Sequence, residues 1–258
     1  MFTVTPIPAF NDNYIWALTR ASAGNKAVVV DPGDATPVMN WLQENQLELD
    51  AILITHHHAD HTGGVAQLVS AFDVPVYGPK DSPFEGISQP LSQGDEIDIL
   101  GLGLTIQAVP AHTRDHISYL QSQGTPQLFC GDTLFLAGCG RLFEGTAKQM
   151  LDAMHYFASL PDATEVYCTH EYSLANLSFA ACVEPENTDI TSTRERCHKL
   201  RENNQPTLPS TIAQEKLINP YMRTQVQAVI NSAEHFSGNA LSSDVEVLAA
   251  LREWKNQF

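Results

Sequence analysis

The sequence has 258 residues, of which 43% are hydrophobic and 17% charged, a composition that is ordinary for a folded protein and excludes a disordered chain. The net charge of −16 argues against nucleic acids and anionic membranes as partners, and no apolar run reaches the roughly 18 residues of a membrane span. Residues 1–20 lack the pattern of a signal peptide, and five scattered cysteines make a poor disulfide framework. We therefore expect a cytoplasmic protein. We also expect it to be a monomer.

Short apolar runs that end in polar or glycine-rich loops fill the first two-thirds of the chain. We predict strands at residues 27–30, 51–54, 104–109, 128–130 and 165–168. Runs of this length and composition are typical of strands that are buried on both faces. Helical patterns at residues 65–72 and 147–159 lie between the strands. This alternation predicts an α/β layered domain.

The strand pattern stops after residue 170, and helices are predicted at residues 173–183, 191–203 and 243–258. Ser243 and Glu246 have the spacing of a capping box at the start of the last helix. We place a domain boundary here, with domains at 1–173 and 174–258. The first has 6 Lys/Arg and 20 Asp/Glu, a net of −14, and the second has 8 and 10, a net of −2. We therefore expect an anionic substrate to be anchored by the C-terminal domain.

The strongest candidate for a metal site is the run from Thr55 to His61, because four of the ten histidines lie within residues 56–61. Alternate residues of an extended chain point the same way, so His56 and His58 can bind one ion. Asp60 and His61 follow a turn of the chain and can face a second ion. Three more ligand-type residues directly follow predicted strands, where α/β domains build their sites: His112, Asp132 and His170. Asp31 also ends a strand, but the Pro-Gly that follows it indicates a turn residue.

These residues resemble a known family. The pattern His-x-His-x-Asp-His at 56–61, together with His112, Asp132 and His170, is similar to the metallo-β-lactamase superfamily. Longer motifs at 131–141, 169–172 and 219–223 resemble the glyoxalase II, or hydroxyacylglutathione hydrolase, family, and the resemblance runs essentially end to end. It implies an αββα sandwich followed by a C-terminal α-helical domain.

The resemblance also implies a role for each candidate residue. One ion would be held by His56, His58 and His112, and the other by Asp60, His61 and His170. Asp132 would bridge the two ions, and Asp60 would also orient the attacking hydroxide. The implied glutathione contacts are Arg141, Tyr172, Arg252 and Lys255, with Phe143 where many relatives have a tyrosine. Imidazoles and carboxylates without a thiolate suit two divalent ions, Zn first, with Fe and Mn as alternatives.

The implied activity is hydrolysis of S-D-lactoylglutathione and other S-2-hydroxyacylglutathiones to glutathione and D-lactate by a metal-bridged hydroxide, the second step of methylglyoxal detoxification. A glutathione-persulfide dioxygenase is the nearest alternative, and Arg252 and Lys255 in the long C-terminal domain favour the hydrolase. A metallo-β-lactamase with two zincs usually has a cysteine where Asp132 stands. A tRNA-processing nuclease of the superfamily would need a basic surface, which this sequence does not offer.

Overall fold

The computed structural model describes residues 1–258, which form two compact units. The first unit consists of Met1–Val109, Asp115–Gly131 and Tyr167–His170. The second consists of Pro110–Arg114, Asp132–Val166 and Glu171–Phe258. No helix has the length and apolar character that crossing a membrane requires.

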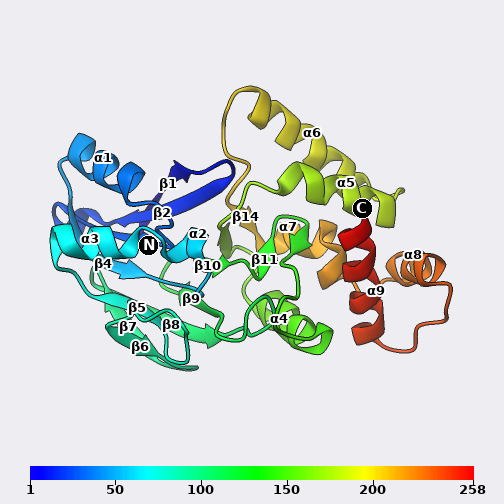
Figure 1. The fold of residues 1–258 in the computed structure, drawn as a ribbon. Coiled ribbons are helices and arrows are strands. Elements are labelled where there is room, and N and C mark those ends of the chain that lie inside the picture. The colour runs from blue at the N-terminus through cyan, green and yellow to red at the C-terminus, as the bar shows by residue number, and fades with distance from the viewer. The chain divides into compact units, whose positions relative to one another are not determined.

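The first unit contains a six-stranded mixed sheet with the strand order β1-β2-β3-β4-β5-β6 (Figure 1). Its strands are β1 (Thr3–Ala9), β2 (Asn13–Thr19), β3 (Lys26–Val30), β4 (Glu48–Leu53), β5 (Val76–Pro79) and β6 (Gln89–Leu91). Strand β2 is antiparallel to its neighbours β1 and β3, and β3 to β6 run parallel. Helices α1 (Ala35–Asn45) and α3 (Val65–Phe72) connect parallel strands, and their buried faces pack on the apolar side chains of the sheet. A short 3-10 turn, η1 (Ala21–Ala23), links β2 to β3.

An antiparallel run of four strands completes most of the first unit. These strands are β7 (Glu96–Ile99), β8 (Leu102–Ala108), β9 (Ile117–Gln121) and β10 (Gln127–Gly131). The hydroxyl of Tyr119 on β9 donates to the carbonyl of Ile54 at 2.7 Å, and the amide of Ile117 donates to the carbonyl of Thr55 at 2.9 Å. Both bonds join this run to the chain just beyond β4. The histidine run therefore starts where the two sets of strands meet.

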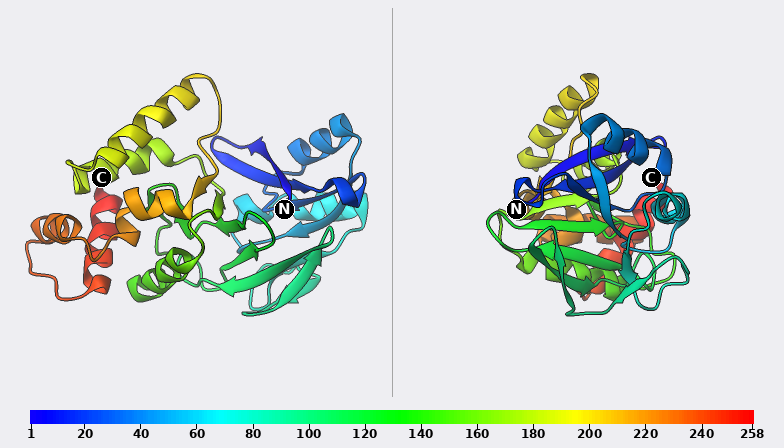
Figure 2. Two further views of the ribbon diagram at one scale, coloured as in Figure 1. Left: turned by 180° about the vertical axis from the view of Figure 1, so that it is seen from behind. Right: turned by 90° about the vertical axis from the view of Figure 1, so that its left-hand side faces the viewer.

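The second unit is mostly helical. Its helices are α4 (Ala147–Ser159), α5 (Ser173–Val183), α6 (Thr188–Glu202), α7 (Ile212–Ile218), α8 (Gln227–Ser237) and α9 (Asp244–Gln257), with the 3-10 turn η2 (Pro220–Met222). Helices α5 and α6 pack together, as do α8 and α9, drawn in orange and red in Figure 2. Strands β11 (Leu134–Phe135) and β12 (Gly138–Cys139) form a small hairpin. The first residues of β13 (Glu165–Cys168) pair with β14 (Ser210–Thr211), a short strand that the sequence pattern did not predict.

Most predicted elements are confirmed, and three helices have the predicted bounds: α3, α4 and α5. Helix α6 begins at Thr188 rather than Thr191, because the side chain of Asn187 caps it by accepting from the amides of Asp189 and Ile190. The predicted capping box of α9 is only half formed. Ser243 accepts from the amide of Glu246 at 3.4 Å, but the Glu246 carboxylate accepts from Ser242 instead of returning to Ser243.

Candidate metal and substrate site

Two of the histidines that follow β4 in the first unit converge, since Nε2 of His56 lies 3.1 Å from Nδ1 of His58. The ring of His57, between them, is directed elsewhere, and its Nδ1 donates to Oδ1 of Asp115 at 2.9 Å. Because the extended chain alternates sides, two imidazoles converge and the third is used for a structural hydrogen bond. His116 stacks on His56, with ring centroids 4.6 Å apart.

A group of three potential ligands forms on the helical turn α2 (Ala59–Thr62) and at the end of β13. The ligand atoms of Asp60, His61 and His170 all lie within 4.8 Å of one another. Oδ2 of Asp60 is 3.5 Å from Nε2 of His61 and 3.4 Å from Nε2 of His170. Burial opposes ionisation of Asp60, but the neighbouring imidazoles of His170 and His61 and the side-chain amide of Asn13 outweigh it and hold the pKa of this carboxyl well below its usual range. Asp60 is therefore an anion that can bind a cation.

Two further carboxylates fix the orientation of these imidazoles. Nδ1 of His61 donates to Oδ2 of Asp31 at 2.9 Å, and Nδ1 of His170 donates to Oδ1 of Asp12 at 2.8 Å. In each ring Nε2 is left to face Asp60. This arrangement, in which one ring nitrogen donates to a carboxylate while the other faces the ion, is usual for metal-binding histidines.

The assignment of Asp31 to a turn is incomplete. Asp31 does have a left-handed backbone, with φ 54°, but its side chain is buried and accepts from the amide and hydroxyl of Thr55 as well as from His61. It lies directly after β3, the strand next to β4 in the sheet. Its position directly after a strand was the one feature of the sequence that indicated a role for Asp31 in orienting a candidate ligand. Asp12 carried no such signal, because its partner is 158 residues away in the chain.

The remaining ligand candidates, His112 and Asp132, lie together in the second unit. Nε2 of His112 is 3.5 Å from Oδ2 of Asp132, and its Nδ1 donates to the carbonyl of Arg141 at 2.9 Å. Gly140 makes this approach possible, since a Cβ there would collide with the carbonyl oxygen of Asp132 and lie 3.0 Å from Nδ1 of His112. The ring of Phe143 packs edge-on against His112, with centroids 5.2 Å apart, and is 62% exposed.

Arg252 and Lys255, the predicted anion anchors on α9, are partly occupied by contacts within the second unit. Arg252 is only 6% exposed, and its Nη1 donates to the carbonyl of Cys139 at 2.9 Å. Lys255 donates to the carbonyl of Ala175 at 3.0 Å. Burial and then the charges of Arg252 and Arg141 lower the pKa of Lys255 to about 8. The charges of Arg252 and Arg141 both act on Lys255, so the predicted anchor gathers positive charge around Lys255. Tyr172, the remaining candidate, is 38% exposed.

The donor set fits divalent metal ions. Four candidate imidazoles have one nitrogen held by an oxygen, from Thr55 for His56, Asp31 for His61, Asp12 for His170 and the Arg141 carbonyl for His112. The second nitrogen of His61, His112 and His170 is then directed at a carboxylate oxygen. Imidazoles held in this way, combined with carboxylates, suit Zn, Fe or Mn.

Comparison with known proteins gives full coverage of the chain. A family model described as metallo-beta-lactamase superfamily matches residues 13–170, and one described as hydroxyacylglutathione hydrolase C-terminus matches residues 171–258. The hydroxyacylglutathione hydrolase of Nitrosomonas europaea is 47% identical over 260 residues, covering 100% of this chain and 97% of that protein.

Solved structures have the same fold. The crystal structure of ETHE1 from Myxococcus xanthus matches with a TM-score of 0.65 and 24% identity over 99% of this chain and 98% of the other. The crystal structure of TTHA1623 in a di-iron-bound form matches with a TM-score of 0.54 and 29% identity, covering 64% of this chain and 91% of that one.

Proposed function

Because the chain belongs to the hydroxyacylglutathione hydrolase family of the metallo-β-lactamase superfamily, we propose that it hydrolyses S-D-lactoylglutathione and other S-2-hydroxyacylglutathiones to glutathione and the hydroxy acid. Its fold is an αββα sandwich with a C-terminal helical domain. The observation that carries the proposal is the group Asp60–His61–His170 with its orienting carboxylates, in a chain 47% identical to such a hydrolase along its full length. A dioxygenase is not favoured, because the family model that matches residues 171–258 and the relative of 47% identity both carry the name of the hydrolase.

We propose that two divalent ions bind, one to His56, His58 and His112 and the other to Asp60, His61 and His170, with Asp132 shared. Strand geometry supports this grouping. The end of β8 pairs with the start of β9 at Ile117, whose amide bonds to the Thr55 carbonyl. Gly131, the last residue of β10, packs directly on the side chain of Thr55. His56 and Asp132 are the next residues along the chain from Thr55 and Gly131, and His112 follows β8 by four positions.

When bound, such ions would lower the pKa of a coordinated water from about 15.7 towards about 7 and act as a Lewis acid for the thioester carbonyl. The protein residues then have separate tasks. Asp60, ionised at neutral pH, would bind metal and orient the attacking hydroxide. The leaving thiolate needs little protonation, since a thiol pKa is about 8.5. No serine or cysteine nucleophile is required.

The glutathione part would be bound by Arg252 and Lys255 of the C-terminal domain, residues 174–258 in our proposal, and by Arg141 and Tyr172 of the first domain, beside Phe143. The cationic cluster of Arg141, Arg252 and Lys255 supports this role, because glutathione carries two carboxylates and the chain as a whole is acidic.

Zinc is the first choice of metal, and the di-iron form of one similar structure supports iron as an alternative. We also keep the expectation of a cytoplasmic monomer without nucleic-acid or membrane partners.

The test is S-D-lactoylglutathione hydrolysis, followed as loss of absorbance at the thioester band, with metal analysis of the same sample. We expect turnover, two ions per chain, and loss of activity on chelation that is reversed by adding metal. A protein that carries two ions and leaves the thioester intact would contradict the proposed substrate while leaving the metal site in place.

A further inference from the structure

The β11–β12 hairpin connects the parts of the second unit that carry candidate ligands. Asp132 lies two residues before Leu134, and Arg141, whose carbonyl holds His112, lies two residues after Cys139. The hairpin has only two residue pairs, Leu134 with Cys139 and Phe135 with Gly138. A two-stranded hairpin of this size is not stable by itself. Something else must therefore hold it.

Side chains from the C-terminal helices bind the backbone of this hairpin at five points. The side-chain nitrogen Nδ2 of Asn219 donates to the carbonyls of Phe135 at 3.2 Å and Gly138 at 2.9 Å. The carboxylate of Glu215 on α7 accepts from the amide of Ala137 at 2.9 Å. Asn176 on α5 and Arg252 on α9 donate to the carbonyls of Leu136 and Cys139.

The two central members of this network, Glu215 and Asn219, are completely buried and bond to each other at 3.0 Å. Ala137 is held in a left-handed conformation, with φ 53°, which is uncommon for a residue with a side chain. Its amide is oriented toward Glu215 by this conformation. Alanine at Gly138 would displace the Asn176 side chain, since its Cβ would lie 2.5 Å from Nδ2 of Asn176. The backbone of the hairpin and the side chains of the helices are thus complementary in hydrogen bonding and in shape.

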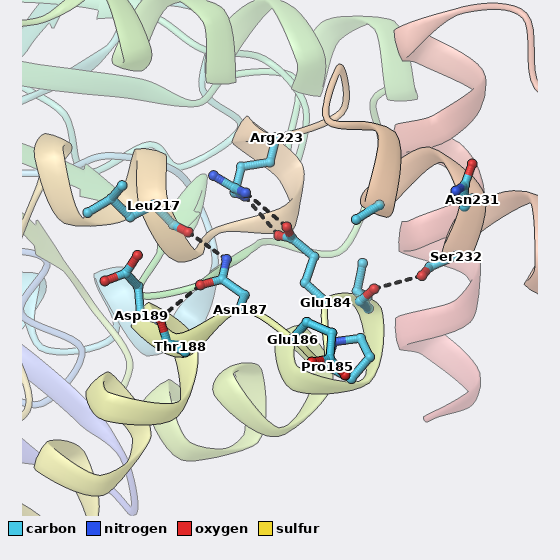
Figure 3. A pocket seen from close by; sticks show the side chains of 12 residues that line it. Glu184, Pro185, Glu186, Asn187, Thr188, Asp189, Leu217, Arg223, Asn231 and Ser232 are labelled. Atoms are coloured by element: carbon cyan, nitrogen blue, oxygen red, sulfur yellow. Dashed lines mark hydrogen bonds and ion pairs between the residues drawn. The ribbon is translucent and has the colours of Figure 1, made fainter.

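The turn that carries Asn219 is itself anchored. Arg223, at the end of η2, forms a two-point ion pair with the buried Glu184, both N–O distances being 2.8 Å (Figure 3). It also donates to the carbonyl of Lys216 at 3.0 Å. The motif at residues 219–223 therefore connects α5 and α7 to the hairpin.

At the other end of the network the hairpin controls two ligand candidates. The amide of Gly140 donates to the carbonyl of Thr133 at 3.2 Å and closes the hairpin next to Asp132. The Arg141 carbonyl accepts from His112 at 2.9 Å and sets the rotation of that ring. A shift of the hairpin would therefore displace a carboxylate and turn an imidazole at the same time.

We propose that Glu215 and Asn219 are positioning residues of the metal centre, which act by holding the β11–β12 hairpin and through it Asp132 and His112. The inference rests on the proposed function only in taking Asp132 and His112 as ligands. Neither Glu215 nor Asn219 touches either residue in the contacts described above, so their effect on metal binding would pass through the backbone of the hairpin.

The test uses the full-length protein loaded with zinc and measures zinc retention against a chelator of known affinity. Asn219→Ala removes both donors to the hairpin carbonyls, and Glu215→Leu removes the acceptor for Ala137. We expect each to weaken the more weakly held zinc by about 10- to 100-fold, the usual effect of losing a group that orients a metal ligand. Glu215→Gln keeps a carbonyl oxygen for the Ala137 amide and should stay within about 3-fold of the wild type.

Two further variants separate positioning from general destabilisation. Leu42→Ala leaves a cavity in the core beside α1 of the first unit and touches no part of the hairpin, so it destabilises the protein but should not change zinc retention. Asn176→Ala removes one bond, to Leu136, and gives a milder readout if Asn219→Ala does not fold. Circular dichroism selects the folded variants for comparison.

Folded Asn219→Ala, Glu215→Leu and Asn176→Ala proteins that all retain zinc as the wild type does would overturn the proposal. So would a loss of zinc in Leu42→Ala as large as in Asn219→Ala. A wild type that binds zinc but does not hydrolyse S-D-lactoylglutathione would overturn the proposed function alone, because zinc retention is measured without turnover.

Discussion

Nε2 of His112 lies 3.5 Å from Oδ2 of Asp132, although they are 20 positions apart in the chain. The other nitrogen of the ring is held by the Arg141 carbonyl, so the imidazole cannot rotate away without losing a hydrogen bond. Two candidate metal ligands of different types are therefore already oriented toward one another in the protein. This preorganisation reduces the entropy that is lost when side chains are ordered by metal binding.

Replacing Asp132 by asparagine should lower both metal content and kcat. The amide keeps the shape of the side chain but loses the negative charge that a shared ligand supplies to two cations. We expect fewer than two ions per chain and a kcat reduced by about 100-fold or more, since the loss of even an indirect metal partner costs 10- to 100-fold. Metal analysis and the thioester assay on one sample measure both. The matched control is Asp162→Asn, which removes an exposed carboxylate paired with Lys216. Unchanged metal content and kcat in Asp132→Asn would rule out the bridging role.

A second prediction concerns Asp31, which touches His61 rather than the ions. In Asp31→Asn one side-chain oxygen still accepts from Thr55, but the amide nitrogen would face Nδ1 of His61, where a donor is already present. We expect the His61 ring to reorient and metal affinity to fall by about 10- to 100-fold. Competition with a chelator measures the affinity. Asp34→Asn is the control, because Asp34 caps α1 and asparagine caps a helix equally well. Wild-type affinity in Asp31→Asn would mean that Asp31 serves only the local backbone.

The sequence predicted the elements that carry the site better than it predicted their surroundings. Short apolar runs marked β3, β4, β8, β10 and β13, and the ligand candidates at their ends were found from that pattern alone. The hairpin of β1 and β2 was missed, although six of the seven residues of β2 are buried. Its prolines and polar residues break the simple alternation that identifies a strand.

Partners that are distant in the chain explain most of what was missed. Asp31 is 30 residues from His61, and Asp12 is 158 residues from His170, so no local spacing reveals either pair. Arg252 resembles an exposed residue near a helix end, where a basic side chain is favourable. It is nevertheless buried, because α9 places it against the carbonyl of Cys139 and the ring of Tyr221. Only the tertiary fold brings these groups together.

The third prediction is that Phe143→Tyr lowers KM for S-D-lactoylglutathione. The Phe143 ring packs edge-on against His112 and is 62% exposed, so a hydroxyl can be added without burying an unpaired polar group. One hydrogen bond to substrate contributes about 0.5–1.5 kcal/mol, which corresponds to about a 2- to 10-fold lower KM with little change in kcat. The control is Phe10→Tyr, at another exposed phenylalanine, which should leave KM unchanged. A higher KM in Phe143→Tyr would show that the substrate lies elsewhere in the pocket.

The fourth prediction is that KM depends on the protonation of Lys255. Burial and the charges of Arg252 and Arg141 lower its pKa to about 8, from an ordinary value of 10.5. A lowered pKa in a lysine means that the cation is present below about pH 8 and is lost as pH rises through that value. An anionic substrate binds the cation better, so KM for S-D-lactoylglutathione should rise between pH 7 and pH 9 as the charge disappears. Bound substrate would itself favour the charged form, which shifts the rise towards higher pH.

Lys255→Arg and Lys255→Met distinguish this cause from titration of the metal centre. Arginine stays charged throughout the range, so KM in Lys255→Arg should remain flat up to pH 9. Methionine keeps the apolar packing against Phe179 and Phe258 but has no charge, so KM should be raised and independent of pH. The pH dependence of kcat, which depends on the metal centre and Asp60, should be the same in all three proteins. If KM rises with pH equally in the wild type and in both variants, the titrating group is not Lys255.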